Sequence, residues 1–120
     1  MHIYEGFPYR LELGGEIVAA FTTARGLRPP SGEGLKYFPN ITLLNGKDDT
    51  GAVSAWRDLV TGGAEQYRKD GAVIRVNGAG NELERWEFFE AFPRIFEDGL
   101  PPYDIKEVDI VVERTERVKR

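Results

Sequence analysis

The sequence predicts a mainly β fold: a small antiparallel β-barrel or sandwich of about six strands with one α-helix. Segments that alternate apolar and polar residues recur along the chain, and short turns rich in glycine and proline separate them. A single segment has the apolar spacing of a helix, so strands do not alternate with helices as they do in parallel sheets. At 120 residues, the chain is expected to form one domain over residues 1–120.

The first two expected strands form a hairpin. Residues 9–13 alternate with a period of two, so their apolar side chains share one face. Gly14 and Gly15 provide the turn into residues 16–24, a strand that is apolar on both faces. Residues 28–34 contain two prolines and two glycines, which cannot sit within a paired strand and therefore predict a loop.

A proline interrupts the next run of β-forming residues. Pro39 is expected to end pairing after Tyr37 and Phe38, and Asn40 to begin a new strand over residues 41–44. The segment is interpreted as a corner of the barrel, with the two aromatic side chains packed against the core or a neighbouring molecule. Its predicted role is structural.

One segment has the pattern of an α-helix. Val53, Trp56 and Val60 recur at i, i+3 and i+7 and form one apolar stripe. Residues 48–50 (Asp-Asp-Thr) supply N-cap candidates and negative charge at the positive end of the helix dipole. The glycine pair at residues 62–63 is expected to end the helix.

Three further strands complete the expected barrel. Residues 72–76 end at a glycine-rich turn over residues 77–81. Residues 83–91 are rich in aromatic side chains, and Pro93 is expected to break this strand. Residues 105–114 are expected to form the longest strand.

This last strand has two chemically different faces. Alternation directs an apolar set toward the core, namely Val108, Ile110 and Val112. It leaves an acidic set for water, namely Glu107, Asp109 and Glu113.

Composition argues against several classes of protein. The formal net charge of −4 and a pI near 5.1 disfavour a general nucleic-acid binder, which needs clustered lysine and arginine. No apolar run approaches the ~20 residues that span a membrane, and the N-terminal residues lack the core of a signal peptide. Because the sequence has no cysteine, no disulfide or thiolate chemistry is expected. Synthesis in the cytoplasm follows by default.

Catalytic and metal-binding patterns are weak. His2 is the only histidine, and the aspartates at 48, 49 and 58 are too sparse for a calcium site. The glutamates at 82, 84, 87 and 90 are interpreted as solvated strand positions and not as a glycosidase pair. Residues 77–80 (Asn-Gly-Ala-Gly) are not followed by a helix, so a hairpin turn is expected there and not a phosphate loop. We expect no enzymatic activity, cofactor or metal.

The chain has more aromatic surface than one small barrel would readily bury. Aromatic residues dominate the energetics of both cores and interfaces. Candidates for either place are Phe21, Tyr37, Phe38, Trp56, Trp86, Phe88 and Phe92.

Four segments, in order, resemble the tail tube protein family of contractile phages and related contractile injection systems. Residues 9–13, the glycine turn and residues 20–27 (AFTTARGL) are similar to the family's opening hairpin. Residues 36–46 (KYFPNITLLNG) resemble the string that precedes the family's single helix, and Trp56 lies on that helix. Residues 86–93 (WEFFEAFP) resemble the tryptophan-to-proline element before the last strand. Residues 28–35 depart from the family by being shorter than its hairpin there, which helps rings to stack.

The resemblance implies a structural subunit that forms stacked hexameric rings around a channel. Its implied partners are other copies of itself and the sheath and baseplate proteins of a tail or injection particle made in bacteria. DNA or protein cargo would pass without specific binding, and no membrane is involved. A tube initiator or terminal tube component of the same machine is the first alternative. A stand-alone ligand-binding barrel, with aromatic residues lining a pocket, is the alternative from a different class.

The resemblance also suggests a location for the acidic face of the last strand. In a ring whose barrel encloses a channel, Glu107, Asp109 and Glu113 would line the lumen and form stacked acidic bands. The alternative interpretation is an ordinary solvated outer face.

Overall fold

The structure is a computed structural model that describes residues 4–27, 40–48, 50–63 and 67–118. The predicted corner at Tyr37, Phe38 and Pro39 lies outside the described residues. The elements of the structure are β1 (Tyr9–Leu13), β2 (Glu16–Arg25), β3 (Ile41–Lys47), α1 (Ala52–Thr61), β4 (Lys69–Val76), β5 (Glu82–Asp98), β6 (Ile105–Val111) and β7 (Arg114–Val118).

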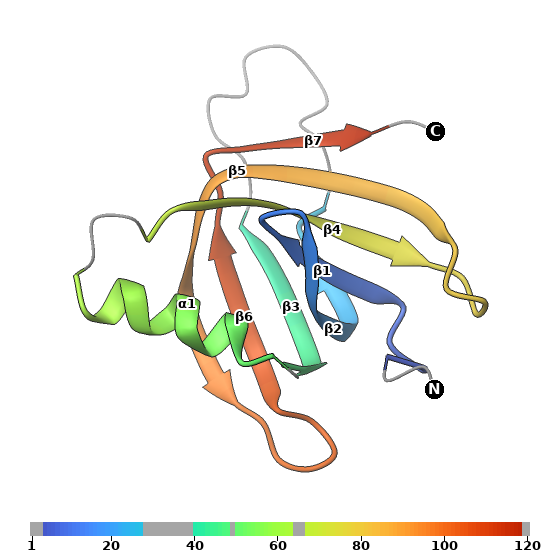
Figure 1. The fold of residues 1–120 in the computed structure, drawn as a ribbon, viewed down its shortest axis with the longest axis horizontal. Helices are drawn as coiled ribbons and strands as arrows, with labels where there is room; N and C mark the ends of the chain where they lie inside the picture. The colour runs from blue at the N-terminus through green and yellow to red at the C-terminus, as the bar shows by residue number, and fades with distance from the viewer. Residues whose placement is uncertain (1–3, 28–39, 49, 64–66, 119–120) are drawn as a thin grey trace.

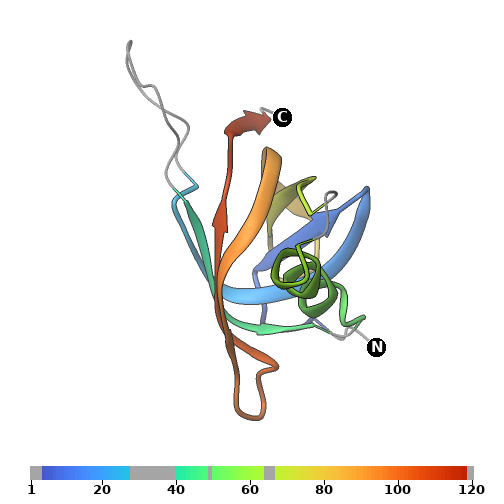
Figure 2. The ribbon, with the colours of Figure 1, turned by 90° about the vertical axis from the view of Figure 1, so that its left-hand side faces the viewer.

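The strands form a closed antiparallel barrel with one helix beside it, which confirms the predicted fold class (Figure 1). Neighbouring strands follow the order β4-β1-β2-β3-β6-β5, and pairing between β4 and β5 closes the circle of six strands. The seventh strand, β7, adds to the outside of this circle by pairing with β5. In Figure 2 the helix α1 is seen end-on in front of the strands.

The strand β5 is the longest element, and the prediction that Pro93 breaks it is wrong. The strand runs through the proline to Asp98. Its first half pairs with β4 and β7, and its second half pairs with β6. Pro93 sits where the register with β6 shifts, a position that tolerates a missing N–H donor. Glu90 has a φ of 51°, so the strand bends just before the proline and continues in a new direction.

The prediction of a single long strand over residues 105–114 is also wrong. The strand β6 ends at Val111, and β7 begins at Arg114 after a short turn. Both strands pair with β5, which bends near Glu90. The chain that pairs with β5 therefore also bends at this level, between β6 and β7. The turn is held by the Glu113 N–H, which donates to the Phe89 carbonyl at 3.1 Å.

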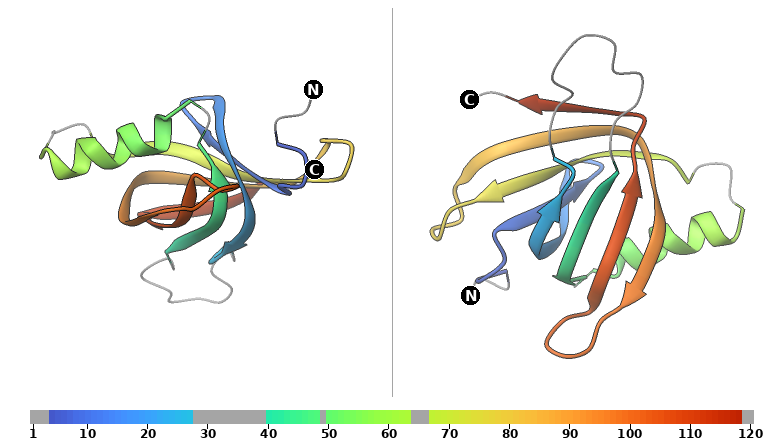
Figure 3. Two further views of the ribbon diagram at one scale, coloured as in Figure 1. Left: turned by 90° about the horizontal axis from the view of Figure 1, so that it is seen from below. Right: turned by 180° about the vertical axis from the view of Figure 1, so that it is seen from behind.

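The helix α1 packs against β5 and β2 at one side of the barrel (Figure 3). Val53 and Trp56 are buried as predicted, whereas Val60 is only half-buried. The Trp56 indole N–H donates to the Tyr67 carbonyl at 2.7 Å, and its ring stacks on Phe88 at 6.4 Å between centroids. This tryptophan therefore joins the helix to the barrel by both packing and a hydrogen bond.

The predicted caps of the helix are found with one change at its start. The N-cap residue is Gly51, which has no side chain to offer. Asp48 takes over from outside the helix, where its carboxylate accepts the Val53 and Ser54 N–H groups, each at 3.1 Å. Gly62 ends the helix as predicted, with its N–H donating to the Asp58 carbonyl at 2.8 Å.

The interior of the barrel is filled by side chains. Fully buried residues come from every strand of the circle and from the helix: Leu11, Phe21, Ile41, Leu43, Trp56, Val73, Phe88, Ile105, Val108 and Ile110. Two glycines make this density possible, because a Cβ at Gly46 would overlap the Phe21 ring and one at Gly71 would lie 2.6 Å from the Phe88 ring. The barrel is a packed core and not a pore.

Candidate assembly surfaces

Several stretches of strand have a backbone edge with no pairing strand among the described residues. The second half of β5 pairs only with β6, and further open edges lie on β7 and β2. The strand β7 pairs with β5 on one side only. Pairing of β1 along β2 reaches Phe21, so the end of β2 from Thr22 to Arg25 pairs only with β3. Open edges present unpaired N–H and C=O groups, which makes them sites where another chain can add a strand.

The outward face of β3, β6 and β5 carries the predicted acidic residues of β6. Cross-strand partners share a face, and the register aligns Thr42 with Asp109 and Leu44 with Glu107. On the other side, Ile95 pairs with Asp109 and Glu97 pairs with Glu107. The apolar set is buried as predicted: Val108, Ile110 and Val112. The predicted burial of the apolar set is therefore confirmed.

Asp109 does not face water as expected, because its side chain is bonded on several sides. The residue is only 6% exposed. Its carboxylate accepts hydrogen bonds from Arg94 at 2.9 Å, Thr42 Oγ1 at 3.0 Å and Asn40 Nδ2 at 3.2 Å. A buried carboxylate needs such partners to offset lost hydration. The positive charge of Arg94 offsets the negative charge of Asp109. The remaining negative charge on this face comes from Glu107 and its cross-strand partner Glu97. Lys106 lies 3.6 Å from Glu97 and offsets part of it.

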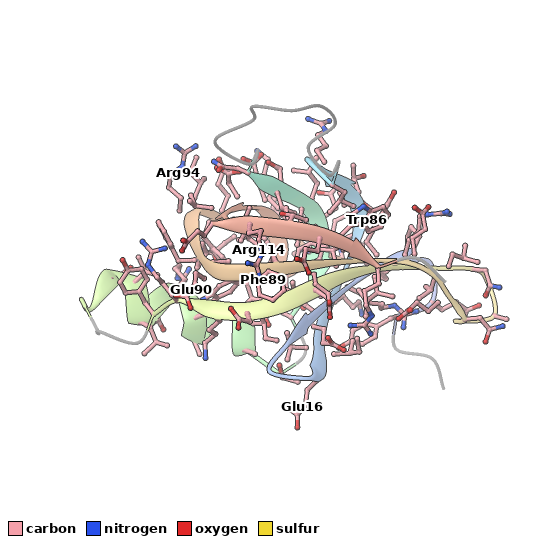
Figure 4. All side chains as sticks on the ribbon, turned by 90° about the horizontal axis from the view of Figure 1, so that it is seen from above. Glu16, Trp86, Phe89, Glu90, Arg94 and Arg114 are labelled. Carbon is pink, nitrogen blue, oxygen red and sulfur yellow. The ribbon has the colours of Figure 1, made fainter. Side chains whose placement is uncertain are left out.

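Glu113 lies apart from the other two acidic residues. It sits in the turn between β6 and β7 and borders an open hollow of about 330 Å³ with Asp70, Phe89, Glu90 and Arg114. The Arg114 guanidinium lies 4.2 Å above the Phe89 ring, and Figure 4 shows these side chains close to Glu90. The structure therefore brings Glu107 and Asp109 together on one face but places Glu113 beyond the end of their strand.

Most of the aromatic candidates are core residues. Phe21, Trp56 and Phe88 are fully buried, and Trp86 is nearly so. Phe92 is half-buried at the edge of the barrel, where its ring meets Tyr67 at 5.3 Å and Arg68 lies 5.1 Å above it. Phe92 is thus the described candidate that remains available to a neighbour.

The outer face of β1, β4 and β5 has a polar network that sequence reasoning missed. Arg85 is bonded to Glu12 at 2.8 Å and to Glu82 at 3.0 Å, above the buried side chain of Ile74. The hydrogen bond that Arg85 donates to Glu12 raises the pKa of Arg85 above its ordinary value, and this effect outweighs the opposing effect of desolvation. Alternation in the sequence indicates that Glu12 and Arg85 both point away from the core. It does not indicate that they contact each other, because that contact depends on the register between the strands.

The residues weighed for chemistry in the sequence have the following places in the structure. In residues 4–27, 40–48, 50–63 and 67–118, no group of three or more His, Cys, Asp or Glu side chains could hold a metal ion. Glu84 forms an ion pair with Arg75. The predicted turn after β4 is present, with Asn77 Oδ1 accepting the Ala79 and Asn81 N–H groups. His2 lies outside the described residues. The helix α1, the one helix in the described part of the chain, lacks the length and apolar character to cross a membrane.

Comparison with known protein families and with curated protein sequences finds no match. Solved structures give a different result: the fold is that of tube and tube-cap proteins of contractile injection systems. The tube-terminating cap of the anti-feeding prophage is 22% identical with a TM-score of 0.60, over 95% of this chain and 89% of that one. A chain of the extended PVC sheath-tube complex is 20% identical with a TM-score of 0.62, over 95% and 90%. Hcp1 from Flavobacterium johnsoniae is 16% identical with a TM-score of 0.57, over 92% and 94%.

Proposed function

We propose that this protein is a structural, non-catalytic subunit of the inner tube of a contractile phage tail or injection system. The observation that carries the proposal is the shared fold, which extends over 92% or more of this chain in the comparisons described. The structures compared include a sheath-tube complex and a tube-terminating cap. The sequence segments that resemble tail tube proteins support the same role independently of the fold.

Subunits of this kind would form hexameric rings that stack into a tube. The open edges at β7 and at the end of β2 support this part of the proposal, because a head-to-tail contact that closes by rotation covers both edges in every copy. Sheath and baseplate proteins would be the outer partners. We place the site of synthesis in the bacterial cytoplasm, with DNA or protein cargo crossing the channel without specific binding.

The outward face of β3, β6 and β5 is the proposed channel lining. Glu107 would give it negative charge, and Asp109 would hold its strands in register through Arg94 and Thr42. Glu113 would add its charge at the end of this face, beyond β6. A negative lining would repel acidic cargo and limit adsorption.

A terminal tube component is the second candidate function. Two of the matching structures are a tube-terminating cap and a sheath/tube terminator. The cap is 22% identical to this chain, a higher identity than the other structures compared above. The short segment at residues 28–35, where the family has a longer stacking hairpin, favours the same candidate. By contrast, a ligand-binding barrel is disfavoured by the filled interior.

Electron microscopy of the purified protein, with native mass spectrometry, tests the proposal. Rings of six copies are expected for either tube role. Rings that lengthen into tubes at high concentration indicate a main tube subunit, whereas rings that stop tubes of a co-expressed tube protein indicate a terminal subunit. A protein that stays monomeric at all concentrations, alone and with such a partner, contradicts both.

A further inference from the structure

The hairpin between β5 and β6 projects from the barrel and carries an exposed apolar tip. It is the orange loop that extends beyond the strands in Figures 1 and 2. Leu100 is 82% exposed, the highest value among the large exposed hydrophobic residues of the described chain. Pro101 and Pro102, which follow it, are exposed as well. Single exposed leucines are common, but one at the end of a protruding hairpin is positioned for a contact.

Backbone and ring contacts hold this hairpin in place. At its base, the Gly99 N–H donates to the Asp104 carbonyl at 3.0 Å, and the Tyr103 N–H donates to the Leu100 carbonyl at 2.9 Å. Asp104 connects the hairpin to β3, where its N–H donates to the Gly46 carbonyl at 2.8 Å. The Tyr103 ring also meets Phe7 edge-on at 6.1 Å. An ordered tip loses little conformational freedom when it binds, which favours association.

An apolar hollow lies elsewhere on the same chain. It has a volume of about 360 Å³ and is formed by the β1–β2 hairpin, the start of α1 and the start of β4. Leu13, Val18 and Ala52 supply its apolar lining, while Lys69 and Asp70 supply polar edges. An apolar floor with a polar rim is the usual composition of a protein-binding surface.

We propose that Leu100 of one copy inserts into this hollow on a neighbouring copy. Tip and hollow belong to different parts of the surface, so the contact is head-to-tail, and each copy can give one and receive one. Repetition of a head-to-tail contact closes a ring or extends a stack, which is why we take the occupant to be a second copy of this chain. The choice of occupant rests on the proposed tube function, whereas the two features do not.

The absence of native cysteine allows a direct test by disulfide trapping. Two single variants, Leu100→Cys and Ala52→Cys, are purified separately, mixed and oxidised. We expect a covalent dimer on a non-reducing gel from the mixture and none from either variant alone. The double variant on one chain should give a ladder of covalent multimers. Pairing Leu100→Cys with Ala79→Cys, in the exposed turn after β4, is the matched control and should give no dimer.

A second measurement uses charge in place of cysteine. Leu100→Asp should weaken self-association at least tenfold in analytical ultracentrifugation. Leu83→Asp, at a leucine 43% exposed on β5, should leave it near the wild-type value. Both positions are exposed, so neither variant is expected to lose its fold.

The outcomes separate this contact from the tube proposal. If the wild type forms rings and the mixed variants do not cross-link, the contact is wrong and the tube function stands. Covalent dimers of Leu100→Cys alone mean that tips meet tips, which also overturns it. Normal assembly by Leu100→Asp means that the tip is not needed for self-association, which also overturns the proposed contact. A monomeric wild type without cross-links removes both proposals.

Discussion

Asp109 shows at the scale of one residue how an outward-facing carboxylate can be structural. Its oxygens are bonded to three side chains from the neighbouring strands β3 and β5 and from the residue before β3. Removing an acceptor that several donors share leaves those donors unpaired in a shielded place, which costs more than losing one hydrogen bond at the surface.

We predict that Asp109→Ala lowers the free energy of unfolding by about 1.5–3 kcal/mol, since hydrogen bonds to a charged group have this range. Glu107→Ala, two residues earlier on the same face, should change it by no more than about 0.5 kcal/mol, as is usual for surface substitutions. Urea unfolding followed by tryptophan fluorescence measures both. Equal effects would mean that the network around Asp109 does not stabilise the fold.

Gly46 makes a second prediction at this scale. A methyl group there would overlap the fully buried Phe21 ring and lie 2.7 Å from the Ala20 carbonyl oxygen. Gly46→Ala should therefore cost about 1–3 kcal/mol, the range for overpacked cores. Gly78→Ala is the matched control, because a Cβ at that position meets nothing within 4 Å. The thermal midpoint should fall for the first variant and stay close to the wild type for the second.

At the scale of the element, Trp56 joins the helix to the barrel in more than one way. Trp56 is fully buried, stacks on Phe88 and donates to the Tyr67 carbonyl. Of the other predicted stripe residues, Val53 is also fully buried and Val60 is half-buried. The helix is short at 10 residues and would be marginal by itself, so its packing residues decide whether it stays folded against the barrel.

We predict that Trp56→Ala removes about 3–5 kcal/mol of stability, a large share of the 5–15 kcal/mol typical of a small domain. Trp56→Phe should keep part of the packing and lose the hydrogen bond, and so should fall between the alanine variant and the wild type. Circular dichroism with thermal melting distinguishes the three. An unchanged midpoint for Trp56→Ala would contradict the role given to this residue.

Elements with a local signal were predictable from the sequence, and those set by contacts between strands were not. The alternation in residues 9–13 and the spacing of Val53 and Trp56 depend on neighbours in the chain, and both elements are present. Pro93 failed as a predictor because the structure places it at a register shift, where a missing N–H is tolerated. The break between β6 and β7 follows the bend of β5 at Glu90. No sequence pattern predicts the positive φ of this residue.

The candidate site divides in the same way. Alternation correctly placed Glu107 and Asp109 opposite the buried face of their strand. It could not reveal that Arg94 reaches Asp109 from another strand, because that contact depends on the register between β5 and β6. The Arg85 network was missed for the same physical reason.

At the scale of the whole molecule, the proposed lining makes a prediction about access. In assembled tubes, Glu107→Cys should react with a small maleimide but not with one too bulky to enter the channel. Ala79→Cys, in an exposed turn away from this face, should react with both. Equal labelling of Glu107→Cys by both reagents along intact tubes would place this face on the outside.

The short segment at residues 28–35 leads to another prediction at this scale. If a long hairpin is needed there for stacking, the isolated protein should form rings more readily than tubes. Lengthening the segment with a flexible insert should not improve stacking, whereas a hairpin taken from a tube protein with the same fold should. Negative-stain images count rings and tubes directly, and long regular tubes from the unmodified protein would contradict the prediction.

The filled interior of the barrel has a consequence for how such a protein can change over time. Because no passage runs through a subunit, the width of any bore is decided by how many copies surround it, and its chemistry by side chains that the core does not need. Under the proposed function, exposed positions on that face such as Glu107 can change with the cargo at little cost in stability, whereas the bonded Asp109 cannot. Substitutions inside the barrel endanger folding without altering what passes. Selection can therefore act on conduction and on foldability through largely separate sets of positions.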